Sequence, residues 1–254
     1  MLVKLLLITN RGDIINITAI IPARYSSTRL PGKPLKDICG KTMLQRVYEQ
    51  VKKVSLIDEV IVATDDKRIF DEVKKFNSNV IMTSKDHKTG TDRLAEVAAK
   101  IDTDIIVNVQ GDEPLIKPSV IKFAIKPLLT DNSLKMSTLK HLISDEEEIN
   151  NPNIVKVITD KSNNAIYFSR SRIPYARNNQ KFNYYKHIGL YVYRSDFLLK
   201  FAKMKPTPFE IQESLEQLRV IENGYKIKVI ETEYDSIGVD TEEDLNKVRN
   251  ILGE

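Results

Sequence analysis

The stretch Ile20-Ile-Pro-Ala-Arg-Tyr-Ser-Ser-Thr-Arg-Leu-Pro-Gly-Lys-Pro-Leu35 decides the fold, because it joins an apolar run to a stiff, positively charged loop. The run at 17–21 is short and β-branched and ends at Pro22, which predicts a buried strand rather than a helix. Prolines in the loop fix φ and remove backbone donors. Three cations lie among them: Arg24, Arg29 and Lys33. We expect this loop to bind a polyanion.

The loop matches neither of two common phosphate-binding motifs. The pattern G-x-x-x-x-G-K-[ST] is absent, and Gly32 stands alone among prolines, so G-x-G-x-x-G is absent too. A P-loop or purine-dinucleotide fold is therefore disfavoured. Cationic residues are usually solvated at the surface, but three of them straight after a buried strand favour a phosphate-binding role.

The composition indicates a protein with a sizeable core and little net charge. Of the 254 residues, 41% are hydrophobic, which suits one large α/β domain or two small ones. Lysine and arginine number 39 against 35 acidic residues, with no block of like charges, so we expect no nucleic acid partner. No run approaches the ~20 apolar residues of a membrane span, so we expect no membrane partner.

The N-terminal run and the cysteine content predict a cytoplasmic protein. The apolar run at 1–8 is interrupted by Lys4, and no small-residue cleavage site follows it, so we expect no export. The single cysteine, Cys39, excludes an intramolecular disulfide and fits a reducing compartment. We expect no catalytic thiol, because no histidine lies near Cys39 in the sequence.

Strands and helices alternate in the first half of the chain, which predicts an α/β fold with a mostly parallel sheet flanked by helices. The expected strands are 17–21, 59–63, 80–82 and 105–109, and the expected helices are 42–54, 67–75 and 92–101. After Pro118 the rhythm changes to a mixed or antiparallel lobe. Its expected elements are strands at 135–142, 154–159, 165–169 and 187–193 and a helix at 210–223, followed by a strand at 226–230 and a helix from 241.

The chain has no repeat and no flexible linker, so we expect residues 1–254 to form a single domain. Residues 17–134 and 226–254 would form its nucleotide-binding part, and residues 135–225 a second lobe grafted onto it.

Carboxylates follow two expected strands, at the edge where open α/β sheets bind their ligands. Asp112 comes directly after a buried run, and Gly111 allows the backbone to approach a ligand. Such a carboxylate either holds a divalent ion against phosphate oxygens or serves as a turn or N-cap residue. Asp240 has the same two interpretations, because Thr241-x-x-Asp244 matches a capping box.

Further polar residues offer contacts to a nucleotide or to an acidic substrate. Arg93 lies at the start of an expected helix, where it either binds a ligand or belongs to a capped helix end. Arg170 and His187 lie at late strands, where an acidic substrate can bind, although singly such residues are more often surface or core residues. The helix expected at 210–223 presents one polar face, either solvated or bound to a polyhydroxylated ligand: Glu213, Glu216 and Gln217.

Nine motifs occur along the chain in a fixed order. They are P-A-R-x-x-S-x-R-L-P-G-K-P-L at 22–35, A-T-D-D at 63–66, T-G-T-D-R at 89–93, N-V-Q-G-D-E-P at 108–114, N-P-N-x-V-K-V at 151–157, Y-F-S-R-S at 167–171, H-I-G at 187–189, L-E-Q-L-R at 215–219 and G-V-D-T-x-E-D-L at 238–245. Together they resemble the 3-deoxy-manno-octulosonate cytidylyltransferase family, the CMP-Kdo synthetases, from about residue 17 to the C-terminus.

The resemblance implies a Rossmann-like nucleotidyltransferase fold that transfers CMP from CTP to the anomeric hydroxyl of Kdo. Pyrophosphate would leave, Mg²⁺ would be the cofactor, and the product would serve lipopolysaccharide synthesis. The family usually forms a homodimer through its later lobe, so residues 135–225 would bind the sugar and carry the dimer contact. The nucleophile would belong to the substrate, so catalysis would depend on positioning and charge neutralisation. No residue stands out as a general base.

The family's motifs assign roles position by position. Arg24 and Lys33 would bind the CTP phosphates with Ser27 nearby, and Asp112 and Asp240 would bind Mg²⁺. The cytidine part would contact Arg93 and Gln110. The sugar-acid side would be lined by Gln110, Arg170, His187, Glu213, Glu216 and Gln217.

The chain departs from the family pattern at several places. Residues 1–16 precede the usual family start and receive no role. Thr89 replaces a common serine and keeps a hydroxyl, whereas Arg172 replaces a position that is commonly apolar or proline, so that we expect an effect on sugar preference. Three alternatives stay open: a cytidylyltransferase for another acidic sugar (8-amino-Kdo or a sialic acid), a pyrophosphorylase that uses a sugar phosphate, and a non-catalytic nucleotide sensor.

Overall fold

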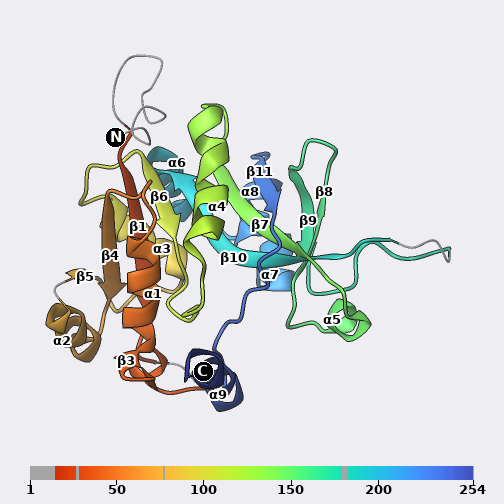
Figure 1. Ribbon diagram of the computed structural model, residues 1–254. Coiled ribbons are helices and arrows are strands. Elements are labelled where there is room, and N and C mark those ends of the chain that lie inside the picture. Colours follow the sequence, from red (N-terminus) through yellow and green to blue (C-terminus); the bar gives the residue numbers. More distant parts are fainter. Residues whose placement is uncertain (1–14, 27–28, 77, 179–181, 254) are drawn as a thin grey trace.

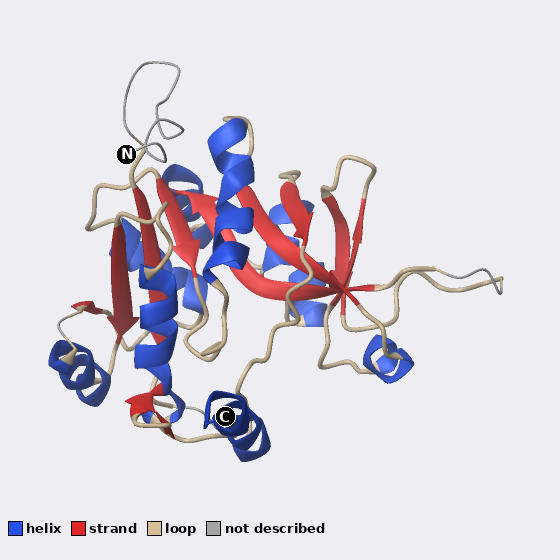
Figure 2. Ribbon diagram, viewed as in Figure 1, coloured by secondary structure: helices blue, strands red, loops and turns tan. Residues whose placement is uncertain are grey.

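The computed structural model of the chain describes residues 15–26, 29–76, 78–178 and 182–253. A twisted central sheet has helices on both faces, and the described residues between β9 and β10, 170–178 and 182–184, extend away from the body (Figures 1 and 2). Within the described residues the sheet has nine strands, in the order β11-β7-β10-β6-β1-β4-β5, with β8 paired to β10 and β9 paired to β8. This arrangement is the α/β fold that the alternating pattern predicts.

The first half of the chain supplies the parallel part of the sheet. β1 (Ile17–Ala23) lies between β4 (Glu59–Thr64) and β6 (Ile105–Asn108), and β5 (Asn79–Met82) extends β4. All four strands confirm the elements expected from the sequence. Because the strands are parallel, their carboxyl ends meet at one edge of the sheet.

The later strands form the mixed part of the sheet, as predicted. β10 (Tyr185–Arg194) runs antiparallel to both β6 and β7 (Met136–Leu142). The pair β8 (Lys156–Thr159) and β9 (Ala165–Ser169) is also antiparallel. β11 (Ile227–Glu231) pairs in parallel with β7, so this strand extends the later lobe although the sequence places it with the nucleotide-binding part.

Two layers of helices cover the sheet, and the alternating side chains of β1 point into both. Ile17, Ala19 and Ile21 pack in a core with residues of α1 (Met43–Lys52), α2 (Lys67–Lys75) and α4 (Pro118–Thr130). Ile20 packs in a second core with residues of α3 (Gly90–Ala98), α6 (Ser195–Ala202) and α8 (Gln217–Glu222). β1 is therefore buried on both faces, which explains its continuous apolar sequence.

Local signals place the ends of three helices that border the parallel sheet. Thr42 caps α1 by accepting a hydrogen bond from Gln45 N, and Asp66 caps α2 by accepting one from Arg68 N. Thr89 and Asp92 form a reciprocal capping box at the start of α3. The side chain of Asp92 is thus used to begin the helix.

A small third core fixes the C-terminal helix beside the cationic loop. Leu30 and Ile38 pack there with Val239 and with Leu245 and Val248 of α9 (Glu242–Gly253). The hairpin β2 (Asp37–Ile38) and β3 (Lys41–Thr42) and the short helix η2 (Lys33–Leu35) complete this corner. Residues of the loop after β1 and of the C-terminal helix, far apart in the sequence, therefore lie side by side.

The prediction of a single helix at 210–223 is wrong. The chain forms α7 (Pro208–Glu213), turns at Ser214 with φ of +53°, and continues as α8. Arg219 of α8 folds back onto α7 and pairs with Glu210, a buried ion pair with Nε to Oε2 at 2.7 Å. The break turns Glu213 and Glu216 in different directions, so they do not share one polar face.

Three helices have no counterpart among the sequence predictions: α4, α5 (Glu146–Asn150) and α6. In α4, Pro118 occupies the first turn and Pro127 lies inside, and prolines in a sequence suggest a break rather than a thirteen-residue helix. No helix in the described part of the chain is long and apolar enough to cross a membrane.

Candidate active site

The cationic loop leaves the carboxyl end of β1 and is closed by contacts of Tyr25. Gly32 N donates to Tyr25 O at 3.1 Å, and Gly32 has φ of +68°, a conformation that favours glycine. A Cβ at Gly32 would lie 3.1 Å from Cζ of Tyr25. The Arg68 guanidinium lies 3.2 Å from the centre of the Tyr25 ring and is itself fixed by two bonds to Asp66. The loop is thus braced against the start of α2.

Arg24 and Lys33, the two cations expected at the CTP phosphates, border one cavity of about 370 Å³. Arg24 Nη2 donates to the carbonyls of His87 at 3.0 Å and Thr89 at 2.9 Å, which ties the loop to the segment before α3. Ser26 also lines this cavity. Ser27 lies outside the described residues.

Asp112 and Asp240 converge on the ammonium group of Lys33. Nζ lies 2.6 Å from Asp112 Oδ2 and 3.0 Å from Asp240 Oδ1, and Arg29 Nη2 lies 2.9 Å from Asp240 Oδ2. Burial would lower the pKa of Lys33, but attraction and hydrogen bonds from the two carboxylates outweigh it and raise the pKa. Lys33 therefore stays charged.

The backbone around both aspartates explains this convergence. A Cβ at Gly111 would lie 3.1 Å from the Pro22 carbonyl, so glycine lets the loop after β6 pack against the end of β1. Val239 N donates to Asp112 O at 2.9 Å, which joins the two segments next to the carboxylates. The capping box predicted at Thr241 and Asp244 is also present, with the Asp244 carboxylate accepting from the Asp240 and Thr241 amides.

The placement of the two carboxylates is compatible with the divalent cation that the family resemblance implies. They lie on either side of one positive charge, so both can face a common cation. No group of three or more acidic, histidine or cysteine ligands for a metal exists within the described residues. Mg²⁺ is commonly bound by one or two carboxylates, with phosphate oxygens and waters as the other ligands.

Gln110 connects this cavity with a second one of about 260 Å³. Of the expected sugar-side residues, Gln110, Glu216 and Gln217 line the second cavity. Glu216 accepts a short hydrogen bond from Thr91 Oγ1, which links α8 to the start of α3. Burial raises the pKa of Tyr191, which also lines this cavity, so its phenol stays protonated.

His187 lies on β10 and lines a third cavity of about 710 Å³, which shares Arg29 and Asp240 with the first. Its Nε2 lies 2.9 Å from Thr138 Oγ1. Burial lowers the pKa of His187 to about 3, so the imidazole is neutral at physiological pH. The three cavities thus share lining residues at the carboxyl edge of the parallel strands.

Arg170 and Glu213 bind each other and do not line the cleft. Glu213 accepts from Ser169 Oγ at 2.6 Å and from Arg170 N at 2.9 Å, while Arg170 Nε donates to Glu213 O at 2.9 Å. Neither belongs to the described residues that line the three cavities. The expected contact of these two residues with the sugar acid is not supported by this geometry.

Arg93 lies beneath the cleft rather than in it. Its side chain is fully buried, with Nη2 2.7 Å from Asp65 Oδ2 and Nη1 close to Thr83 Oγ1. The expected direct contact with cytidine is therefore absent from this arrangement. Arg93 instead ties the end of β4 to the start of α3.

The sequence interpretation missed several residues that line the second cavity: Thr91, Asn108, Tyr191 and Tyr193. A signal for Tyr191 was present, because it follows His187 by four positions on one strand and therefore lies on the same face. The two rings lie 5.2 Å apart. Thr91 and Asn108 lie within the motifs at 89–93 and 108–114, but nothing in their type distinguishes them from capping or core residues.

The fold and this cleft define a nucleotidyltransferase, and the family model described as Cytidylyltransferase matches residues 18–227. A protein of *Geobacter metallireducens* named 3-deoxy-manno-octulosonate cytidylyltransferase is 58% identical over 91% of this chain and 96% of its own length. A protein of *Fusobacterium nucleatum* with the same name is 57% identical over 92% of this chain and 96% of its own length. This chain belongs to the 3-deoxy-manno-octulosonate cytidylyltransferase family.

Solved structures agree with this placement. A CMP:2-keto-3-deoxy-manno-octonic acid synthetase complexed with CTP superposes with a TM-score of 0.90 at 45% identity, covering 94% of this chain and 98% of the other. A 4-diphosphocytidyl-2C-methyl-D-erythritol synthase from *Anaerococcus prevotii* reaches 0.63 at 20% identity, over 94% of this chain and 99% of the other, and shares the fold.

Proposed function

We propose that this enzyme transfers CMP from CTP to the anomeric hydroxyl of Kdo, which gives CMP-Kdo and pyrophosphate. The hydroxyl oxygen forms a bond to the α-phosphorus, the bond to the pyrophosphate oxygen breaks, and the hydroxyl proton leaves to water. The observation that carries the proposal is the convergence of Lys33, Asp112 and Asp240 in one cavity, which shares Gln110 with a second cavity rich in hydrogen-bonding groups. The CTP complex and the names of the relatives support the same reaction.

The protein's own residues would act by position and charge. Lys33 keeps its positive charge and, with Arg24, offers cations to the phosphates at the end of β1. Holding both substrates in one cleft reduces the entropic cost of bringing them together. Fixed cations near the pyrophosphate would stabilise the negative charge that develops as it leaves.

Asp112 and Asp240 would hold the Mg²⁺ ion. When bound, this ion supplies Lewis acidity at the phosphate oxygens and helps to neutralise the leaving pyrophosphate. The two carboxylates would leave the remaining ligand positions to phosphate oxygens and water.

Kdo would occupy the second cavity, next to the phosphates. Gln110 lies where the two cavities meet, so its amide can contact either substrate. Glu216 and Gln217 offer acceptors and donors to sugar hydroxyls there. His187 is neutral, and because its Nε2 bonds to Thr138, its other ring nitrogen, Nδ1, is the one that can serve a ligand from the neighbouring cavity.

Pyrophosphate release across the four nucleoside triphosphates and several sugar acids tests the reaction. We expect product with CTP, Kdo and Mg²⁺ and a loss of turnover with chelator. Release with CTP and a sialic acid but not with Kdo would instead favour the alternative acidic sugar, and 8-amino-Kdo belongs in the same panel. Release only with a sugar phosphate would favour a pyrophosphorylase, and no turnover with any pair would favour a nucleotide sensor.

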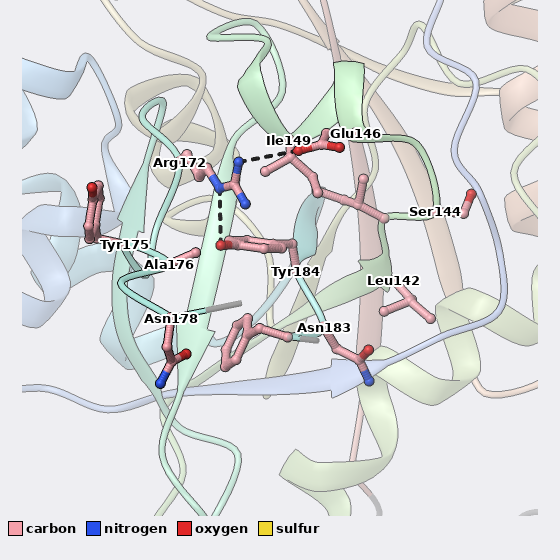
Figure 3. Close-up of a pocket in the computed structure, with 12 residues that line it drawn as sticks. Leu142, Ser144, Glu146, Ile149, Arg172, Tyr175, Ala176, Asn178, Asn183 and Tyr184 are labelled. Atoms are coloured by element: carbon pink, nitrogen blue, oxygen red, sulfur yellow. Dashed lines mark hydrogen bonds and ion pairs between the residues drawn. The ribbon is translucent and has the colours of Figure 1, made fainter. Parts of the chain in front are cut away.

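We also propose that the enzyme works as a homodimer through its later lobe. Residues 170–178 and 182–184 form an arm that extends from the body (Figure 1), and its Tyr175 and Phe182 are 86% and 53% exposed. The arm borders a cavity of about 960 Å³, in which Arg172 packs on Tyr184 and lies 3.5 Å from Glu146. Figure 3 shows how these side chains face one another. Arg172 thus lies in this arm, which does not support the expected effect on sugar preference.

Light scattering after size exclusion tests the dimer, with Tyr175→Asp as the variant that we expect to shift mass toward the monomer. A wild type with the mass of a monomer would refute the dimer. Cytoplasmic location and supply of lipopolysaccharide synthesis complete the proposal. The location rests on the proposed nucleotide substrate and on the exposed free thiol of Cys39, which suits a reducing compartment. The role in lipopolysaccharide synthesis rests on the family resemblance alone.

A further inference from the structure

Lys33 occupies the place between the two aspartates that a divalent cation would need. Its Nζ lies 2.6 Å from Asp112 Oδ2 and 3.0 Å from Asp240 Oδ1, so one ammonium group bonds both carboxylates. The Lys33 side chain is only 14% exposed, whereas that of Asp240 is 45% exposed. The cation is thus buried against the carboxylates rather than resting on the surface.

The charges of this cluster are already balanced without a metal. The two carboxylates face Lys33, and Arg29 binds the second oxygen of Asp240 at 2.9 Å. Two negative and two positive charges leave no net attraction for an added dication. The described residues around the pair also offer no third carboxylate, histidine or cysteine that would complete a protein-only metal site.

We propose that Lys33 excludes free divalent cations from the site and yields its place when a triphosphate arrives. This inference rests on the proposed function, because it concerns how that site takes its metal. The enzyme then accepts the metal together with the triphosphate, whose phosphate oxygens draw the ammonium away and supply the missing ligands. Lys33 thus determines that the site takes the metal bound to a triphosphate rather than the free ion.

The structure lets the Lys33 side chain move while its backbone stays in place. Lys33 N donates to Leu30 O at 3.1 Å, Leu35 N donates to Gly32 O at 2.9 Å, and Pro34 is buried. The ammonium sits on a flexible four-carbon stem with three donors, so it can exchange carboxylate for phosphate oxygens. No backbone rearrangement of the loop is required.

The test measures Mn²⁺ binding to the full-length protein without nucleotide, by the loss of the free Mn²⁺ signal in electron paramagnetic resonance. We expect weak binding to the wild type and affinity about tenfold higher or more for Lys33→Met, because a unit charge within a few ångströms is removed. Lys33→Arg keeps the charge and should bind as weakly as the wild type. Lys36→Met is the matched control, since Lys36 lies in the same loop and pairs with Glu242 at 3.7 Å.

A double variant locates the gained ion. Lys33→Met combined with Asp112→Asn should return Mn²⁺ binding to the wild-type level, while far-UV circular dichroism checks that each variant is folded. Equal Mn²⁺ affinity for the wild type and a folded Lys33→Met protein overturns the inference, and so does a gain that survives Asp112→Asn. If Lys33→Met does not fold, Lys33→Gln takes its place in the same comparison.

The two proposals fail separately. Pyrophosphate release from CTP and Kdo by the wild type tests the reaction alone. If the wild type is active but binds free Mn²⁺ as tightly as Lys33→Met does, the proposed reaction stands and the proposed exclusion of metal by Lys33 is wrong.

Discussion

Glu113 follows Asp112 at the cleft and gives the fold a stability that depends on pH. Its side chain is buried with 7% of the residue exposed, and Oε2 has no hydrogen-bond partner within the described residues. Burial, with a smaller contribution from the charge of Asp112, raises the pKa of Glu113 from 4.5 to about 7. The folded protein therefore binds more protons than the unfolded chain between these two pH values, and the free energy of unfolding falls as pH rises through this window.

The perturbation is Glu113→Gln, which keeps the shape and removes the charge. One pKa unit corresponds to about 1.4 kcal/mol. Relative to a side chain that never ionises, Glu113 therefore lowers the free energy of unfolding by about 1 kcal/mol at pH 5, where only the unfolded chain is ionised, and by about 3 kcal/mol at pH 8. The free energy of unfolding of the variant, relative to that of the wild type, should therefore rise by about 2 kcal/mol as pH goes from 5 to 8.

Urea unfolding of both proteins at pH 5, 6, 7 and 8, with chelator present, measures this difference. Glu49→Gln serves as the control. Burial raises the pKa of Glu49, but hydrogen bonds from Lys41 and Gln45 outweigh this effect and lower the pKa. The stability that the ionised Glu49 contributes is therefore lost only at pH values below this window. A Glu113→Gln difference that stays constant from pH 5 to pH 8 would refute the reasoning.

Three further predictions concern the loop, the split helix and the proposed metal ligand Asp112. Gly32→Ala should destabilise the protein by about 1–2 kcal/mol and raise the KM for CTP, because its φ is positive and the new Cβ meets Tyr25; urea unfolding and initial rates measure both. Glu210→Gln leaves Arg219 buried without a carboxylate and should cost about 3 kcal/mol in urea unfolding. Asp112→Ala should abolish pyrophosphate release yet unfold cooperatively, and loss of cooperativity would indicate a structural role instead.

The sequence by itself was sufficient to predict the strands and helices that local residue patterns specify. The run at 17–21 and strands β4 and β6 could be predicted because a strand buried on both faces is continuously apolar. The edge strand β5 is only partly buried, and its short β-branched run indicated it instead. The order of the motifs was also sufficient to indicate the family. Helix α4 could not be predicted in the same way, because Pro118 and Pro127 suggest breaks until packing in the core stabilises the helix.

Tertiary structure alone decided which motif residues meet in the cleft. Lys33 and Asp240 are separated by 207 positions and Lys33 and Asp112 by 79, yet one ammonium group bonds both carboxylates. Arg93 belongs to a motif as distinctive as these, and Glu213 lies just before another. Their charges are nevertheless satisfied, by Asp65 for Arg93 and by the Ser169 hydroxyl and the Arg170 amide for Glu213. The type and spacing of residues show which charges a chain has, whereas sheet order and long-range packing determine which charges stay free for a ligand.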